Sequence, residues 1–333
     1  MMAAIRYEPA IDGLRSIAIL AVIVFHLSPR WLPGGFAGVD VFFVISGYLI
    51  TSIQLAEMEQ RTFRLSRYYQ KRIARIFPAM ICAACVTMMM AALLYDAQER
   101  AAAGANFTAS ILSLENMKVM LQGNYFQLSR DNQPFMHFWS LSVEEQFYVL
   151  FPLLLMVAHG LGRRVLATGL FLLTAASLVA CVILTHYRPS MAFFLLPSRA
   201  WELLFGAILA CQVRWGRDSA VPASTSILQI AGMSGLVASF VLLDETQPFP
   251  GVAALLPALA TVALIAGVRG GEGVVAAALG HWAPVLIGRL SYSLYLWHWP
   301  IDSFVDYAYP RTAELQRAGV KCAATLACAW LSY

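Results

Sequence analysis

The sequence is poor in charged residues. Aspartate, glutamate, lysine and arginine make up 13% of its 333 residues, whereas 59% are hydrophobic. A soluble globular domain carries about a quarter charged residues. The low charge content and the mean hydropathy of +0.66 therefore exclude a water-soluble domain of ordinary composition and indicate a polytopic membrane protein. The net charge of +4 is small and spread over short loops, so we expect no nucleic-acid partner.

The sequence also lacks several common catalytic and structural signatures. It has no G-x-S-x-G nucleophile elbow, no Walker sequence and no spaced cluster of metal ligands, so we expect no metal. Its six cysteines lie in or beside apolar stretches, which predicts no structural disulfide. Cys82 and Cys85 form a C-x-x-C pair that favours helix packing over redox chemistry. No cleavage site of a signal peptide follows Arg6 and Glu8.

Ten apolar stretches, separated by short charged or Pro/Gly-rich turns, predict an all-α bundle of about ten transmembrane helices. The stretches cover approximately residues 13–27, 36–55, 78–95, 139–159, 165–185, 196–213, 227–243, 251–268 and 286–305, with the last beginning near 315. The longest polar connection runs from about 96 to 138. We expect a single transmembrane domain over residues 1–333, truncated in the last helix, because that segment has no polar exit.

The distribution of basic residues predicts a cytoplasmic N-terminus. With that orientation the inner ends of the segments carry fourteen lysine and arginine residues, whereas the outer ends carry eight. Cytoplasmic loops of membrane proteins carry the excess of positive charge. Six of the fourteen lie in the most basic stretch, between Arg61 and Arg75. We therefore expect a multi-pass protein, in contact with the lipid bilayer, whose basic stretch faces the cytoplasm.

The first apolar segment carries two polar residues on one face. Arg15 and His26 are eleven residues apart, and eleven helical steps return to nearly the same face about 16 Å further along the axis. Polar groups are costly in hydrocarbon, so the alignment favours a lined path over lipid contact. His26 is then a candidate general base toward a hydroxyl, and the alternative is a hydrogen-bonded interior histidine.

The basic stretch has two interpretations. Arg72 and Arg75 are three residues apart, so they share a helix face at the membrane edge. Arginine binds phosphate oxygens in a bidentate manner, which favours a phosphate-binding surface. The alternative is a topology determinant that lies against anionic lipid headgroups.

A polar run opens the fourth apolar segment. Ser140 or Ser142 can cap its helix, and carboxylates such as Glu144 and Glu145 are favoured near a helix N-terminus. However, Glu144 and Tyr148 are four residues apart, so a polar face continues into the membrane, which capping does not require. A functional role for this face is the alternative.

Two further clusters leave alternatives open. Arg199 and Glu202 are three residues apart in an apolar segment, where they form an internal ion pair or contact a substrate. The run Ser291–Pro300 is rich in tryptophan, tyrosine and histidine. Such a run is typical of an aromatic belt at the membrane interface, and it can equally line a sugar site.

Together these motifs resemble acyltransferase family 3, the bacterial membrane O-acyltransferases that modify surface polysaccharides. The blocks stand in the family's order and cover nearly the whole chain. They are residues 7–15, His26, 38–50, 69–78, 139–148, 196–206 and 290–300. The sequences of these blocks are similar to those of the subgroup that carries an extra transmembrane helix and a C-terminal SGNH hydrolase-like domain. Neither of these two parts is in this sequence.

The resemblance implies transfer of an acyl group, commonly acetyl, from cytoplasmic acetyl-CoA or another acyl-CoA. The acceptor is a hydroxyl of an extracytoplasmic carbohydrate: lipopolysaccharide O-antigen, capsule, exopolysaccharide or peptidoglycan. It also implies the bacterial inner membrane and a C-terminal or separate SGNH-type domain as a further partner. The expected catalytic residues are His26 and Glu144. The expected donor-binding residues are Arg15, Arg72 and Arg75. The expected substrate-binding residues are Trp139, Glu145, Tyr148, Arg199 and Glu202.

We expect His26 to deprotonate the acceptor hydroxyl, with Glu144 orienting or polarising it, and a transient acyl-enzyme is the alternative route. Two other protein classes compete with an enzyme. A transporter or flippase would line a solute path with polar groups, and inverted repeats would favour it, but the sequence has no convincing repeat. A non-catalytic scaffold has no need of ionisable groups at membrane depth.

Overall fold

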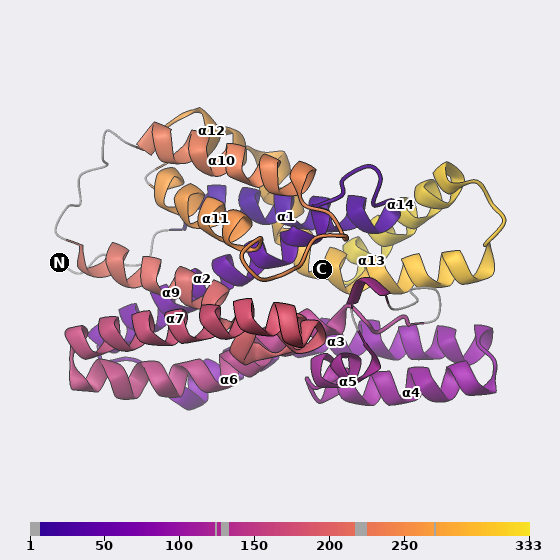
Figure 1. The fold of residues 1–333 in the computed structure, drawn as a ribbon, viewed down its shortest axis with the longest axis horizontal. Coiled ribbons are helices and arrows are strands. Elements are labelled where there is room, and N and C mark those ends of the chain that lie inside the picture. Colours follow the sequence, from indigo (N-terminus) through magenta and orange to yellow (C-terminus); the bar gives the residue numbers. More distant parts are fainter. Residues whose placement is uncertain (1–6, 124, 128–132, 217–224, 270) are drawn as a thin grey trace.

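The computed structural model describes residues 7–123, 125–127, 133–216, 225–269 and 271–333. Every regular element in these ranges is a helix, and Figure 1 shows long helices lying side by side along the longest axis of the molecule. Seven helices of the described chain are long and apolar enough to cross a membrane. The predicted all-α membrane bundle is therefore confirmed.

Each of the ten predicted apolar segments corresponds to a helix. The seven long apolar helices are α1 (Pro9–Leu27), α2 (Gly38–Glu59), α3 (Leu65–Leu94), α6 (Phe138–Leu161), α7 (Arg163–Tyr187), α9 (Leu196–Trp215) and α10 (Thr225–Leu242). The other three are α11 (Leu255–Val268), α13 (Trp282–Ala308) and α14 (Glu314–Leu331). Short helices connect them: η1 (Gly35–Ala37), α8 (Pro189–Phe194) and α12 (Val274–Leu279). α13 and α14 are joined by a buried ion pair, because the Nζ of Lys321 lies 2.6 Å from Asp302.

The connection between α3 and α6 is more regular than its polarity predicts. It contains α4 (Ala97–Ile111), α5 (Glu115–Gln122) and η2 (Tyr125–Gln127). α4 begins with a capping box, in which Asp96 accepts from the backbone N–H of Glu99 at 2.8 Å and Glu99 accepts from that of Asp96 at 3.3 Å. Two unpaired backbone donors of the helix start are thereby satisfied. The D-x-x-E spacing was a readable sign of this helix.

α1 lies at the centre of the packing. Leu14 and Phe25 belong to an apolar cluster shared with α2, α6 and α9. Ile19 and Val22 belong to a second cluster shared with α3 and α13. All four side chains are fully buried. Because much of α1 is covered by neighbouring helices, its polar residues can face protein rather than lipid.

Glycines bring the central helices into close approach. A methyl group on Gly288 of α13 would lie 1.7 Å from the carbonyl oxygen of Asp12 on α1. A methyl group on Gly47 of α2 would lie 1.8 Å from the carbonyl oxygen of Leu203 on α9. Small residues let helix backbones approach closely, and the resulting van der Waals packing helps to hold helices together within a membrane. These contacts fix how the polar faces of α1 and α13 meet.

Gly288→Ala is expected to destabilise the bundle by about 2 kcal/mol or more, because the added methyl forces α13 away from α1. The thermal midpoint of the protein in detergent measures this. Gly319→Ala on α14 is the matched control: nothing lies within 4 Å of its added methyl, so this variant should be neutral or stabilised. Equal thermal midpoints for Gly288→Ala and Gly319→Ala would contradict the close packing of α1 against α13.

Candidate functional site

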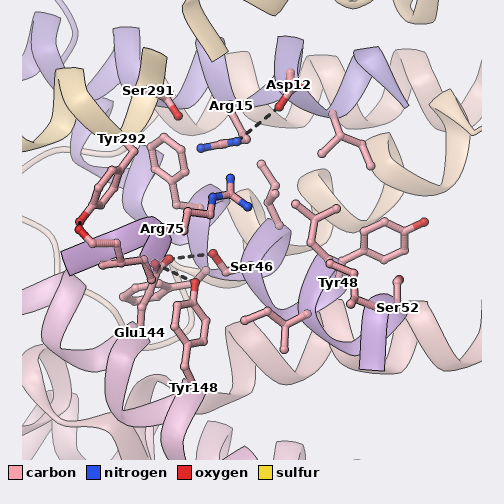
Figure 2. A pocket seen from close by; sticks show the side chains of 18 of the residues that line it. Asp12, Arg15, Ser46, Tyr48, Ser52, Arg75, Glu144, Tyr148, Ser291 and Tyr292 are labelled. Carbon is pink, nitrogen blue, oxygen red and sulfur yellow. Dashed lines mark hydrogen bonds and ion pairs between the residues drawn. The ribbon is translucent and has the colours of Figure 1, made fainter. Parts of the chain in front are cut away.

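A large cavity of about 1080 Å³ opens among α1, α2, α3, α6 and α13. Figure 2 shows polar side chains from these helices projecting into it, among them Asp12 and Arg15 from α1, Ser46 from α2 and Arg75 from α3. Seven arginines and five carboxylates line the cavity. The excess of positive charge suits an anionic ligand.

Ion pairing divides the arginines of the large cavity into two groups. Arg15 contacts Asp12 at 3.3 Å, and Arg214 contacts Glu59 at 2.6 Å. In contrast, Arg72 and Arg75 have no carboxylate within ion-pair distance among the residues that the structure describes. The guanidinium of Arg72 lies 5.0 Å from the ring centroid of Tyr148. Their charges are therefore available to a bound anion.

Glu144 faces the large cavity from α6. Its carboxylate accepts from the hydroxyl of Ser46 at 2.9 Å and from that of Tyr148 at 3.0 Å (Figure 2). Figure 2 also shows the guanidinium groups of Arg15 and Arg75 between this carboxylate and Asp12. The neighbouring Glu145 lines the same cavity and accepts a hydrogen bond from Ser113. On this side of the large cavity, α6 therefore presents carboxylates, and the guanidinium groups of Arg15 and Arg75 lie across from Glu144.

His26 lies in a second, much smaller cavity of about 10 Å³, which is close to the space of one water molecule. Its Nε2 lies 3.2 Å from the hydroxyl of Tyr125, and its Nδ1 lies 3.2 Å from the Nε2 of His298. The other lining residues are mostly apolar or aromatic: Val22, Phe36, Val39, His137, Trp139, Phe193 and Tyr295. His26 thus lies in a small, mostly aromatic chamber, and we call this the His26 chamber.

Tyr295 separates the large cavity from the His26 chamber. It lines both spaces, together with Val39. Its hydroxyl lies 2.6 Å from the hydroxyl of Ser140 and donates to the carbonyl oxygen of His137 at 3.1 Å. Ser140 itself lines the large cavity. Tyr295, together with Val39, therefore stands between the arginine-lined space and the imidazole.

The structure brings most of the predicted site residues together, but in two places. The residues that line the large cavity are Arg15, Arg72, Arg75, Glu144, Glu145 and Tyr148. The residues that line the His26 chamber are His26 and Trp139. The sequence predicts that Glu144 orients or polarises the acceptor hydroxyl at His26, whereas the structure places its carboxylate on the wall of the large cavity, among the arginines. Arg15 and His26 lie along one helix, as predicted, with Tyr295 between their cavities.

Arg199 and Glu202 line neither cavity. Arg199 bridges Asp40 at 3.0 Å and Glu202 at 3.1 Å, and none of the three side chains is more than 1% exposed. Its guanidinium also lies 5.4 Å from the ring centroid of Phe43 and 5.9 Å from that of Trp139. This is the internal ion pair that the sequence left open as an alternative, extended by Asp40. An aspartate within an apolar segment was a readable signal.

Three further residues around the imidazole were not singled out from the sequence, although two of them lie in the run Ser291–Pro300, for which a sugar site was one interpretation. Tyr125 lies in the polar connection, where nothing in its pattern indicates a site. His298 and Tyr295 lie in the aromatic run, which aromatic-belt placement explains equally well. Their convergence on His26 depends on tertiary packing over 99 and 272 residues of sequence for Tyr125 and His298.

A basic cavity beside a partly buried imidazole suits the transfer of a group from an anionic donor. A family model described as an acyltransferase domain, Acyl_transf_3, matches residues 8–333. The chain belongs to acyltransferase family 3. The resemblance seen in the sequence is thereby confirmed. No solved structure matches the chain significantly.

Curated relatives of this acyltransferase-family chain include O-acetyltransferase OatA from three strains of Staphylococcus aureus: NCTC 8325 / PS 47, COL and MRSA252. Each is 33% identical over 315 residues, which cover 91% of this chain and 52% of the relative. The chain therefore spans about half the length of the curated relatives it matches.

Proposed function

We propose that this chain is the transmembrane part of a bacterial inner-membrane O-acetyltransferase. It takes an acetyl group from cytoplasmic acetyl-CoA and passes it to a hydroxyl of an extracytoplasmic carbohydrate. The observation that carries the proposal is the position of Tyr295, which with Val39 lies between a large arginine-lined cavity and the partly buried imidazole of His26. Membership of the acyltransferase family and the named O-acetyltransferase relatives support it.

The donor occupies the large cavity. Coenzyme A carries several phosphate groups on a nucleotide head and a long thin pantetheine arm, and a cavity of about 1080 Å³ is large enough for a ligand of that size. Arg72 and Arg75 hold the phosphates through charge-assisted hydrogen bonds. The pantetheine arm follows α6 toward Ser140, and the amide N–H groups of the arm can donate to Glu144. On this proposal Glu144 positions the donor.

The acceptor hydroxyl meets the thioester at His26. The hydroxyl oxygen attacks the thioester carbonyl carbon, its proton passes to Nε2 of His26, and the C–S bond breaks. The departing thiolate then takes the proton, which restores neutral imidazole. Tyr295 must move aside for the thioester to enter the His26 chamber, because its side chain lines both spaces.

Arg72→Ala and Arg75→Ala are each expected to raise the KM for acetyl-CoA about 10- to 100-fold while kcat changes little, because a hydrogen bond to a charged group is worth about 1.5–3 kcal/mol. Calorimetric binding and initial rates of the full-length protein measure this. Arg67→Ala is the matched control, since Arg67 is exposed on the same helix and does not line the cavity. Unchanged acetyl-CoA binding in both variants would remove the donor role.

A transporter or flippase is the second candidate, because buried polar groups also line solute paths. The full-length protein, reconstituted in vesicles and supplied with acetyl-labelled acetyl-CoA and candidate glycans, separates the two functions. Label on the glycan together with released CoA thiol is the expected result. Movement of glycan across the bilayer without label would support the transporter instead.

A further inference from the structure

His298 lies directly behind His26. It belongs to α13, its side chain is 4% exposed, and its Nε2 lies 3.2 Å from Nδ1 of His26. The two rings are nearly parallel, with centroids 5.2 Å apart and an interplanar angle of 25°. The other nitrogen of His298, Nδ1, lies 2.7 Å from the backbone carbonyl oxygen of Tyr295, one turn earlier on the same helix. α1 and α13, which carry the two imidazoles, also approach each other closely where Gly288 meets Asp12.

These contacts assign the hydrogens of both rings. A carbonyl oxygen only accepts, so Nδ1 of His298 carries a hydrogen and donates to Tyr295. In neutral His298 the Nε2 is then an acceptor, and Nδ1 of His26 must donate to it. Neutral His26 therefore presents the lone pair of Nε2, and this atom faces the hydroxyl of Tyr125 at 3.2 Å. The chain of contacts runs from a backbone carbonyl through two imidazoles to the chamber.

We propose that His298 is a positioning residue for acyl transfer, which holds His26 in the tautomer whose Nε2 accepts the proton of the acceptor hydroxyl. The inference rests on the proposed role of His26 as the base. When Nε2 takes the proton, the hydrogen on Nδ1 stays donated to His298, so the new positive charge is shared with a second imidazole. The hydroxyl of Tyr125 marks where the acceptor hydroxyl binds.

An imidazole suits this task at membrane depth. In serine hydrolases a buried carboxylate orients the catalytic histidine, and loss of the correct tautomer lowers kcat about 10⁴-fold. A buried carboxylate adds a charge whose burial in hydrocarbon costs free energy. Neutral His298 supplies an acceptor without that charge, and the carbonyl of Tyr295 fixes which of its nitrogens accepts. Tyr295 therefore has two roles. Its side chain lies between the two cavities, and its carbonyl oxygen fixes the tautomer of His298, which in turn fixes that of His26.

Two variants of His298 separate positioning from packing. His298→Phe keeps a planar ring but removes the acceptor, and we expect kcat to fall about 10²- to 10⁴-fold with little change in the KM for acetyl-CoA. His298→Gln places an amide oxygen where it can accept from Nδ1 of His26, and we expect at least about tenfold more activity than in the phenylalanine variant. His186→Phe, at an exposed position of α7, should transfer at the wild-type rate.

A spectroscopic readout tests the tautomer itself. Solid-state NMR of the full-length protein, labelled with ¹⁵N-histidine and assigned with His26→Gln, should show His26 with hydrogen on Nδ1 in the wild type and in His298→Gln. The Nδ1–H form should be lost in His298→Phe. A wild-type His26 with hydrogen on Nε2, or a His298→Phe variant with wild-type kcat, would overturn the inference. If His26→Gln itself transfers normally, the assignment of His26 as the base is wrong, whatever the tautomer. If the wild type transfers no acetyl group, the proposed function fails instead.

Discussion

His26→Gln is expected to lower kcat for acetyl transfer by at least about 10²-fold and up to about 10⁴-fold, with acetyl-CoA binding unchanged. A positioned general base contributes rate enhancement of this size. The donor keeps its affinity because the arginines line the large cavity, whereas His26 lines the separate chamber beyond Tyr295. Initial rates with labelled acetyl-CoA, together with calorimetric donor binding, measure both quantities on the same preparation.

The control for this variant is His186→Gln, an exposed histidine near the end of α7 that lines neither cavity. It should match the wild type in rate and in binding. If His26→Gln transfers acetyl groups at the wild-type rate, the assignment of the base is wrong. If it loses acetyl-CoA binding as strongly as activity, donor binding and base catalysis do not belong to two separate cavities.

Arg199→Leu is expected to abolish folded protein rather than one step of the reaction. Its guanidinium compensates the carboxylates of Asp40 and Glu202, and all three groups are fully buried. Removing one partner of a buried ion pair costs about 3–5 kcal/mol, because the remaining charge stays uncompensated. The yield of monodisperse protein and its thermal midpoint in detergent measure the loss.

A matched variant tests the electrostatic cause of that loss. Arg199→Leu combined with Asp40→Asn and Glu202→Gln removes the uncompensated charges, and replacing a whole buried ion pair with neutral groups is often nearly neutral for stability. The triple variant should therefore recover most of the folded yield. A single Arg199→Leu variant that folds like the wild type but binds no acceptor would instead support the substrate role predicted from the sequence.

Local patterns in the sequence predicted the helices well, because each apolar segment must satisfy its own backbone hydrogen bonds in lipid. The same reasoning located charged residues such as Arg15 and Glu144, since ionisable groups at depth need a reason to be there. It did not reveal α4, whose capping box sits in a stretch that reads as a polar loop. Hydrophobicity dominated the interpretation there and hid a local signal.

The division of the site into two cavities could not be predicted from any single segment. On α1 alone, Arg15 and His26 indicate one continuous path. The partition is made by Tyr295 of α13 and its bond to Ser140 of α6, two helices that are far apart in sequence. The neighbours of His26 converge in the same way: His298 comes from α13 and Tyr125 from η2, both far from α1 in sequence. Such contacts are decided by packing, which leaves little trace in composition or periodicity.

The most direct test of transfer through the two cavities is a sided assay. The full-length protein is reconstituted in vesicles with acetyl-labelled acetyl-CoA only on the side where α1 begins, and an impermeant glycan acceptor only on the opposite side. The account predicts that labelled glycan and released CoA thiol appear in equal amounts on opposite sides, and that His26→Gln abolishes both. Glycan that becomes labelled only when donor and acceptor share a side would contradict a path from the large cavity, past Tyr295, to His26.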